Sequence, residues 1–190
     1  MSKQFPSLGS IHRTFIARQK IFFAASAAPG ARVNLSPRGT DALRVLAADC
    51  VVWLDLTGSS NETAAHLAAD GRLTLMFCAF EGPPMILRLY GQGRVIRRGT
   101  PDYAELLATH YDGDEPRGAR QMIRLDVDLV QTSCGYGVPR FESVGPRDQL
   151  DHWVASRTDA ELEDYRRRKN AVSIDGLPTG LFDDVAPPRA

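Results

Sequence analysis

Cysteine is scarce in this chain, and neither sign of charge predominates. The three cysteines, Cys50, Cys78 and Cys134, are widely spaced and form no C-x-x-C pair, which argues against a disulfide framework and against a zinc site. Lysine and arginine together number 23, as do aspartate and glutamate, so the formal charge at pH 7 is +0. Proteins that bind the phosphate backbone of nucleic acids usually carry a basic excess. No nucleic-acid partner and no metal are therefore expected.

Long apolar runs are also missing. No stretch of about 18 apolar residues is present that would span a bilayer, and the N-terminal segment has no apolar run of signal-peptide length. No membrane partner is expected, and a cytoplasmic location is the default interpretation. With 190 residues, of which 43% are hydrophobic, the chain is long enough to bury the core of one domain.

The hydrophobic pattern predicts strands separated by short helices. Helices are expected over residues 11–19, 61–70 and 101–111, and strands over 20–26, 32–36, 50–56, 72–80, 85–97 and 121–130. Hairpin-linked strands around inserted helices favour an antiparallel, barrel-like α+β domain over a parallel βαβ fold. We expect this domain to span residues 1–147, with a C-terminal helix and tail, residues 148–190, packed on it.

The most informative segment is Asp55 to Thr63, where an apolar strand ends in a hydroxyl-rich turn before a helix. Free backbone N–H groups, hydroxyls and the positive end of a helix dipole are typical of anion and phosphate sites. A purely structural interpretation is also open, because Ser59 and Glu62 stand at capping-box spacing and Ser59 would then only cap the helix. The lysine and the glycine spacing of a nucleotide P-loop are missing, so positive charge must come from elsewhere.

Three arginines are candidates for that charge. Arg32 lies on the polar face of the alternating segment 32–36, Arg38 follows this segment, and Arg88 interrupts the apolar run 85–90. An arginine flanked by leucines is either a surface residue with a solvated head group or a ligand clamp in a cleft. By contrast, the basic run 166–169 is typical of a solvated helix end.

Taken together, these segments resemble the pyridoxamine 5′-phosphate oxidase-like family of FMN-binding split barrels. The resemblance covers nearly the whole chain and rests on RVNLSPRG (32–39), VWLDLTGSSNET (52–63), LTLMF (73–77), ILRLYGQG (86–93), TSCGYGVP (132–139) and YRRRKNAVSIDGLP (165–178). It implies an antiparallel six-stranded split β-barrel with short flanking helices and a C-terminal helical segment. It also implies a homodimer with one FMN per subunit in each of two clefts at the dimer interface.

The resemblance further implies which residues bind the cofactor. In that family the strand matching Arg32 to Arg38 follows the flavin ring and ribityl chain, and the turn matching Asp55 to Thr63 holds the ribityl chain and phosphate. The implied set is Arg32, Val33, Asn34, Leu35, Ser36, Arg38, Asp55, Leu56, Thr57, Ser60, Asn61, Glu62, Thr63, Arg88 and Tyr136. The frequent Ser-Arg-Lys phosphate motif of the family is replaced here by residues 60–63, so arginines elsewhere must compensate.

The activity implied is that of an FMN-dependent oxidoreductase acting on a small molecule, with the cofactor supplying the redox chemistry. Pyridoxamine phosphate is not the expected substrate, because residues 173–190 lack the Arg and His pair of the authentic oxidases. Three alternatives stay open. The first is a non-catalytic flavin-binding stress or sensor protein. The second is a split barrel that binds a deazaflavin, or haem held by His66 or His110. The third is a structural dimer with an empty site. Cys134 is a reactive thiol near the flavin or, as a lone cysteine, only structural.

Overall fold

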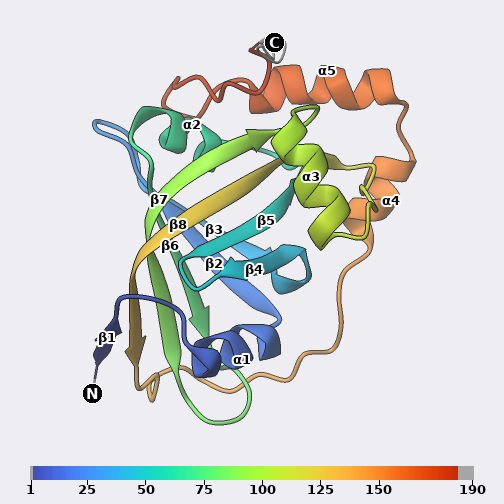
Figure 1. The fold of residues 1–190 in the computed structure, drawn as a ribbon. Helices are drawn as coiled ribbons and strands as arrows, with labels where there is room; N and C mark the ends of the chain where they lie inside the picture. The colour runs from blue at the N-terminus through green and yellow to red at the C-terminus, as the bar shows by residue number, and fades with distance from the viewer. Residues whose placement is uncertain (1, 184–190) are drawn as a thin grey trace.

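The computed structural model describes residues 2–183, and eight strands in this part of the chain form one curled antiparallel sheet (Figure 1). The strands are β1 (Lys3–Phe5), β2 (Ile21–Ser26), β3 (Asn34–Gly39), β4 (Leu43–Ala47), β5 (Cys50–Leu56), β6 (Arg72–Cys78), β7 (Ile86–Arg97) and β8 (Ala119–Ser133). Their order is β3-β2-β6-β7-β8-β5-β4, and β1 pairs with the end of β8. The predicted antiparallel α+β class is confirmed, with eight strands in place of six.

Five α-helices within residues 2–183 surround the sheet. They are α1 (Ser10–Arg18), α2 (Glu62–Ala69), α3 (Pro101–His110), α4 (Gln149–Ala155) and α5 (Asp159–Asn170), and a 3₁₀ turn, Thr40–Ala42, precedes β4. The helical composition of residues 148–170 belongs to two helices, because Thr158 and Glu161 form a capping box that starts a new one. Residues 184–190 of the predicted C-terminal unit lie outside the described residues. No helix in residues 2–183 has the length and apolarity needed to cross a membrane.

Strand β5 lies inside the molecule and is covered on both faces. On one face Val51 and Trp53 pack into the main core together with Phe22. On the other face Val52 and Leu54 pack into a second apolar cluster beneath α3. Burial on both faces explains why this strand is a continuous apolar run that does not alternate, as the sequence predicted.

Two glycines of β7 allow the sheet to curl and α2 to pack onto its inner face. A Cβ atom at Gly91 would lie 1.9 Å from the carbonyl oxygen of Asp126, at a register irregularity between β7 and β8. A Cβ atom at Gly93 would lie 2.7 Å from Leu67 of α2. Close approach at both positions therefore requires glycine, and it places the start of α2 beside the end of β5.

Hydrogen bonds between side chains connect β3 to β5 and to α2 on the open side of the curled sheet. On β3, Arg38 donates to Asp55 of β5, with 2.5 Å between Nη1 and Oδ1, and Asn34 donates to Thr63 of α2, with 3.1 Å between Nδ2 and Oγ1. The segment after β8 crosses the lower end of the molecule in Figure 1 and climbs along its side to α4. This path brings α5 back to the upper end, near α2.

Candidate functional site

Asp55 is a buried carboxylate at the end of β5 that accepts hydrogen bonds from three side chains. Arg38 binds Oδ1, while Arg120 Nε and Gln121 Nε2 each lie 2.8 Å from Oδ2. Burial by itself would raise the pKa of Asp55, but the guanidinium groups of Arg120 and Arg38 outweigh it and hold the pKa below its ordinary value. Asp55 is therefore an ionised structural centre that fixes the end of the strand.

Two carbonyl groups of the turn after β5, residues 57–60, accept hydrogen bonds from other elements. The carbonyl oxygen of Gly58 accepts from Asn170 Nδ2 at 3.0 Å, and that of Ser60 accepts from Arg120 Nη1 at 2.8 Å. The N–H groups of Ser59 and Ser60 make no hydrogen bond to the part of the chain that the structure describes. In this turn, therefore, the carbonyl groups of Gly58 and Ser60 are bonded, while the N–H groups of Ser59 and Ser60 are available to a ligand.

Helix α2 begins at Glu62 without a side-chain cap. Asn61 occupies the N-cap position, yet its Oδ1 atom accepts from Gln121 Nε2 at 2.8 Å and its buried Nδ2 atom has no partner among residues 2–183. The capping-box interpretation of Ser59 is wrong, because Ser59 stands two residues before the N-cap and is exposed. The unpaired Asn61 amide and the free N–H groups of the first helical turn are all donors, an arrangement suited to an anion.

A chain of polar side chains leads from beneath α2 to the edge strand β3. The Ser26 hydroxyl lies 3.1 Å from Nδ1 of the buried His66 and accepts from Asn34 Nδ2 at 3.2 Å. Ser36 continues the chain by donating to Asn34 Oδ1 at 2.9 Å. Asn34, Ser36 and Thr63 are therefore held in fixed rotamers along one side of β3, as a ligand lying on this strand would require.

The apolar side chains of the predicted set do not share the polar side of β3. Val33 and Leu35 point away from this polar chain and are 74% and 62% exposed. The predicted alternation along β3 is present, but the polar side faces the protein and the apolar side faces solvent. The side chain of Leu56, the residue directly before the turn, packs against the apolar cluster beneath α3.

Two of the predicted residues bind the segment that follows α5. Arg32 forms an ion pair with Asp175, which also accepts from the Arg32 backbone N–H. The carboxylate of Glu62 accepts the backbone N–H of Ile174 at 3.0 Å. The C-terminal segment therefore lies across the start of α2 and the approach to β3, a contact that the sequence pattern did not reveal.

Arg88 and Tyr136 are not brought to the turn within one chain. Arg88 pairs in register with Gln131 of β8, ten residues along that strand from Gln121, and its Nη1 atom lies 3.2 Å from Ser133 Oγ. At about 3.3 Å per residue, this separation far exceeds the length of an arginine side chain. Tyr136 follows the same end of β8 and is 82% exposed.

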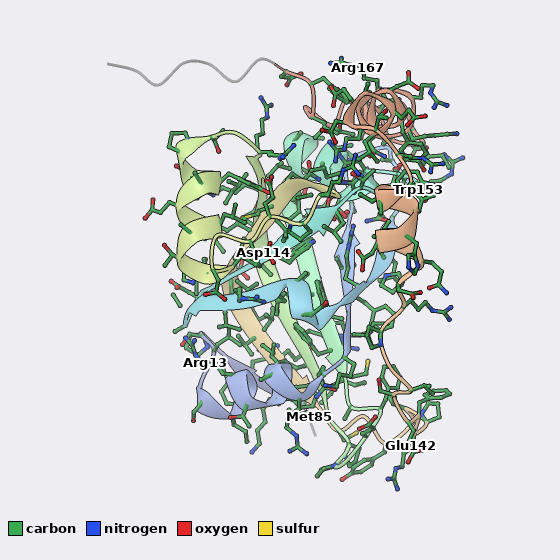
Figure 2. All side chains as sticks on the ribbon, turned by 90° about the vertical axis from the view of Figure 1, so that its right-hand side faces the viewer. Arg13, Met85, Asp114, Glu142, Trp153 and Arg167 are labelled. Carbon is green, nitrogen blue, oxygen red and sulfur yellow. The ribbon has the colours of Figure 1, made fainter. Side chains whose placement is uncertain are left out.

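A cleft lies at that lower end of the molecule, and none of the predicted residues line it. It has a volume of about 830 Å³ between α1, the β6–β7 turn and residues 141–143. Figure 2 shows Met85 and Glu142, two of its lining residues, at the end opposite Arg167 of α5. The cleft and the turn are therefore separate features.

Sequence reasoning missed four residues that shape the turn, namely Arg120, Gln121, Arg166 and Asn170. The expectation that Arg166 belongs to a solvated helix end is wrong, because this residue is 8% exposed. A signal was available: Leu162, Arg166 and Asn170 recur every four residues and are the buried residues of α5. Arg120 and Gln121 offered no such signal, since a polar pair at a strand end gives no indication of burial.

A protein-family model described as pyridoxamine 5′-phosphate oxidase matches residues 10–134. The chain belongs to the pyridoxamine 5′-phosphate oxidase family. The match covers the turn, Arg120 and Gln121, and it confirms the resemblance found in the residues. Helix α5 lies beyond the matched range, so its contacts with the turn are additions to the part common to the family model.

Comparison with individual members of the family gives the same result. The chain is 36% identical to the pyridoxamine 5′-phosphate oxidase family protein ustO of Aspergillus flavus, over 92% of this chain and 76% of that protein. A candidate pyridoxamine 5′-phosphate oxidase from Lactobacillus delbrueckii superposes with a TM-score of 0.52 at 13% identity, covering 66% of this chain and 94% of that one. HupZ of Group A Streptococcus superposes with a TM-score of 0.52 at 15% identity, covering 64% and 91%. The two structures support the split-barrel fold alone.

Proposed function

We propose that this family member binds FMN and acts as an oxidoreductase on a small organic molecule other than pyridoxamine phosphate. The phosphate would lie at the turn and the first residues of α2, Ser59 to Thr63, and the ring would lie along the polar side of β3. The single observation that carries the proposal is the buried Asn61 amide, a donor without a partner at an uncapped helix start. Such a donor costs free energy unless a ligand accepts from it.

The residues present fit a flavin phosphate through donors and not through a conventional basic motif. Donors at this place are the Ser59 and Ser60 hydroxyls, the Asn61 amide and the N–H groups of the helix start. Repulsion between the Glu62 carboxylate and a phosphate is reduced, because this carboxylate already accepts the Ile174 N–H. Arg38 supplies a cation nearby and has a buried Nε atom without a partner among the described residues.

The chemistry would then be divided between cofactor and protein. Bound flavin supplies reversible two-electron transfer to or from a substrate. Asn34 and Ser36 are proposed to orient the ring by hydrogen bonds, because Ser26 and His66 hold Asn34 from behind. His66 is buried with Nδ1 against Ser26, which favours this positioning role over that of an exposed axial ligand for haem.

A homodimer is part of the proposal. The exposed apolar side of β3, with Val33 and Leu35, is a surface that a monomer would leave in water. Arg88 on β7, which pairs with Gln131, and Tyr136 after β8 lie at the far end of the sheet from the turn of their own chain. In a dimer that covers this side of β3, they are proposed to approach the cofactor of the partner.

Flavin binding is tested with FMN and riboflavin, which differ only in the phosphate. We expect the wild-type protein to bind FMN at least about 100-fold more tightly than riboflavin, since several charge-assisted hydrogen bonds are gained. Asn61→Asp keeps the acceptor for Gln121 but replaces the free amide by a carboxylate oxygen. This variant should weaken FMN binding about 30-fold or more and leave riboflavin binding within about 2-fold, as measured by fluorescence titration.

Equal affinity of the wild-type protein for FMN and riboflavin would contradict the phosphate site. A Soret band after addition of haem, without flavin binding, would favour the haem alternative. Sustained consumption of a reductant such as NADPH by the FMN-loaded protein separates an oxidoreductase from a non-catalytic flavin carrier.

The proposed dimer is tested by placing a charge on the exposed side of β3. Light scattering of the wild-type protein should give a mass of about 42 kDa, twice the 20.9 kDa of the chain. Leu35→Asp should shift the protein to the monomer and weaken FMN binding about 10-fold or more, because an unpaired carboxylate is costly in an apolar interface. Val144→Asp is the control, since Val144 is also exposed but lies in the segment between β8 and α4. A dimer that persists in Leu35→Asp would place the interface on another face.

A further inference from the structure

Arg166 of α5 is a buried cation at the turn that follows β5. Its Nε atom donates to Thr57 Oγ1 at 2.9 Å, and its Nη2 atom donates to the carbonyl oxygen of Ala119 at 3.1 Å. Thr57 in turn donates to the carbonyl oxygen of Gly118 from both Oγ1 and its backbone N–H. Arg166 therefore joins the end of β5 to the start of β8, directly before the proposed phosphate turn.

No carboxylate forms an ion pair with Arg166 in the described part of the chain, although Glu163 and Glu115 act on its pKa from a longer range. No acidic group among residues 2–183 lies within ion-pair distance of its guanidinium, whereas its neighbour Arg167 pairs with Glu163 at 2.9 Å and has a side chain 61% exposed. Burial lowers the pKa of Arg166, which reports the cost of holding this charge out of water. A buried cation beside a row of free donors points to an anion as the missing partner.

Asn170 acts on the same turn one helical turn later. Its Nδ2 atom donates to the carbonyl oxygen of Gly58 at 3.0 Å, and its own backbone carbonyl accepts from Thr179 Oγ1 at 2.7 Å. Because Arg166 holds Thr57 and Asn170 holds Gly58, α5 fixes two consecutive residues of the turn. The Thr57 hydroxyl and the Gly58 carbonyl therefore both accept from α5, while the N–H groups of Ser59 and Ser60 keep no partner among the described residues.

We propose that Arg166 is a positioning residue for the flavin phosphate. Arg166 supplies the positive charge that residues 60–63 lack, and it holds the donor side of the turn toward the ligand. The inference rests on the proposed FMN site and adds to it a residue from outside the range of the family model. It also assigns a role to α5, in which Arg167 and Arg168 pair with acidic neighbours on the surface.

The test compares Arg166→Met with Arg167→Met in the full chain, using FMN and riboflavin as ligands. Methionine keeps much of the length of the side chain and removes the charge in both variants. Arg166→Met should weaken FMN binding about 10-fold or more while riboflavin binding stays within about 2-fold. Arg167→Met should change neither affinity. Arg166→Lys keeps the charge but loses the fork of donors, and an intermediate loss of FMN affinity is expected.

A purely structural role would give a different pattern. If Arg166→Met weakened FMN and riboflavin equally, or left both unchanged, the positioning role would be overturned while the FMN site itself stood. If the wild-type protein bound neither flavin, the proposed function would fail and this inference with it. Should Arg166→Met not fold, Arg166→Lys decides alone, because a selective loss of FMN supports the inference and parallel losses overturn it.

Discussion

Replacing Asp55 by alanine is expected to destabilise the fold by about 3–5 kcal/mol. The buried carboxylate accepts from Arg38, Arg120 and Gln121, and its removal leaves the buried Arg120 without an anionic partner. For a chain of this length such a loss lowers the melting temperature by roughly 6–20 °C. Urea unfolding at pH 7 followed by circular dichroism measures the change.

Asp55→Asn is the matched control, because asparagine keeps the size and one acceptor but removes the charge. It should cost less than Asp55→Ala and more than zero. If Asp55→Ala cost below about 1 kcal/mol, the cluster would not be the structural centre that its hydrogen bonds indicate.

The pH dependence of this pair checks the electrostatic cause. The pKa of Asp55 is lower in the folded state than in the unfolded chain, so its stabilisation is complete above about pH 4 and is lost as the pH falls through the folded pKa. Wild-type stability should therefore fall more steeply than that of Asp55→Asn below about pH 4. Parallel curves for the two proteins would show that ionisation of Asp55 does not stabilise the fold.

Replacing Trp53 by alanine should cost about 3–5 kcal/mol through the cavity it leaves. Trp53 is fully buried on the inner face of β5 and meets the ring of Phe22 edge to face, with 5.6 Å between ring centroids. Denaturant unfolding of the two proteins compares their free energies of unfolding directly.

Trp53→Phe separates the volume of the side chain from its polar atom. The indole Nε1 has no hydrogen-bond partner among residues 2–183, so phenylalanine loses volume but also removes an unsatisfied donor. We expect a cost of no more than about 2 kcal/mol. A larger cost for Trp53→Phe than for Trp53→Ala would contradict this account of the core.

Local patterns predicted most elements because burial of one face of an element gives alternating apolar residues, and burial of both faces gives a continuous apolar run. The apolar run of β5 and the alternation of Asn34, Leu35 and Ser36 are both present in the structure. Predictions failed where an element was too short to show a pattern, and where two neighbouring residues were both suited to the N-cap position. The three-residue β1 has no periodicity to detect, and Ser59 stood at capping spacing while the cap position passed to Asn61, held by Gln121 from β8.

The sequence by itself determined the antiparallel α+β class and the position of the turn after β5, since these follow from the periodicity and order of neighbouring residues. The family was recognised from the resemblance of its motifs. Only the tertiary structure decided which donor side chains meet at that turn. Arg120, Arg166 and Asn170 lie about 60 to about 110 residues from it along the chain, and the curl of the sheet and the return of α5 bring them there. Arg32 looked equally suitable in sequence, yet it pairs with Asp175. Charge pairing across the fold is a long-range property, and local spacing carries no information about it.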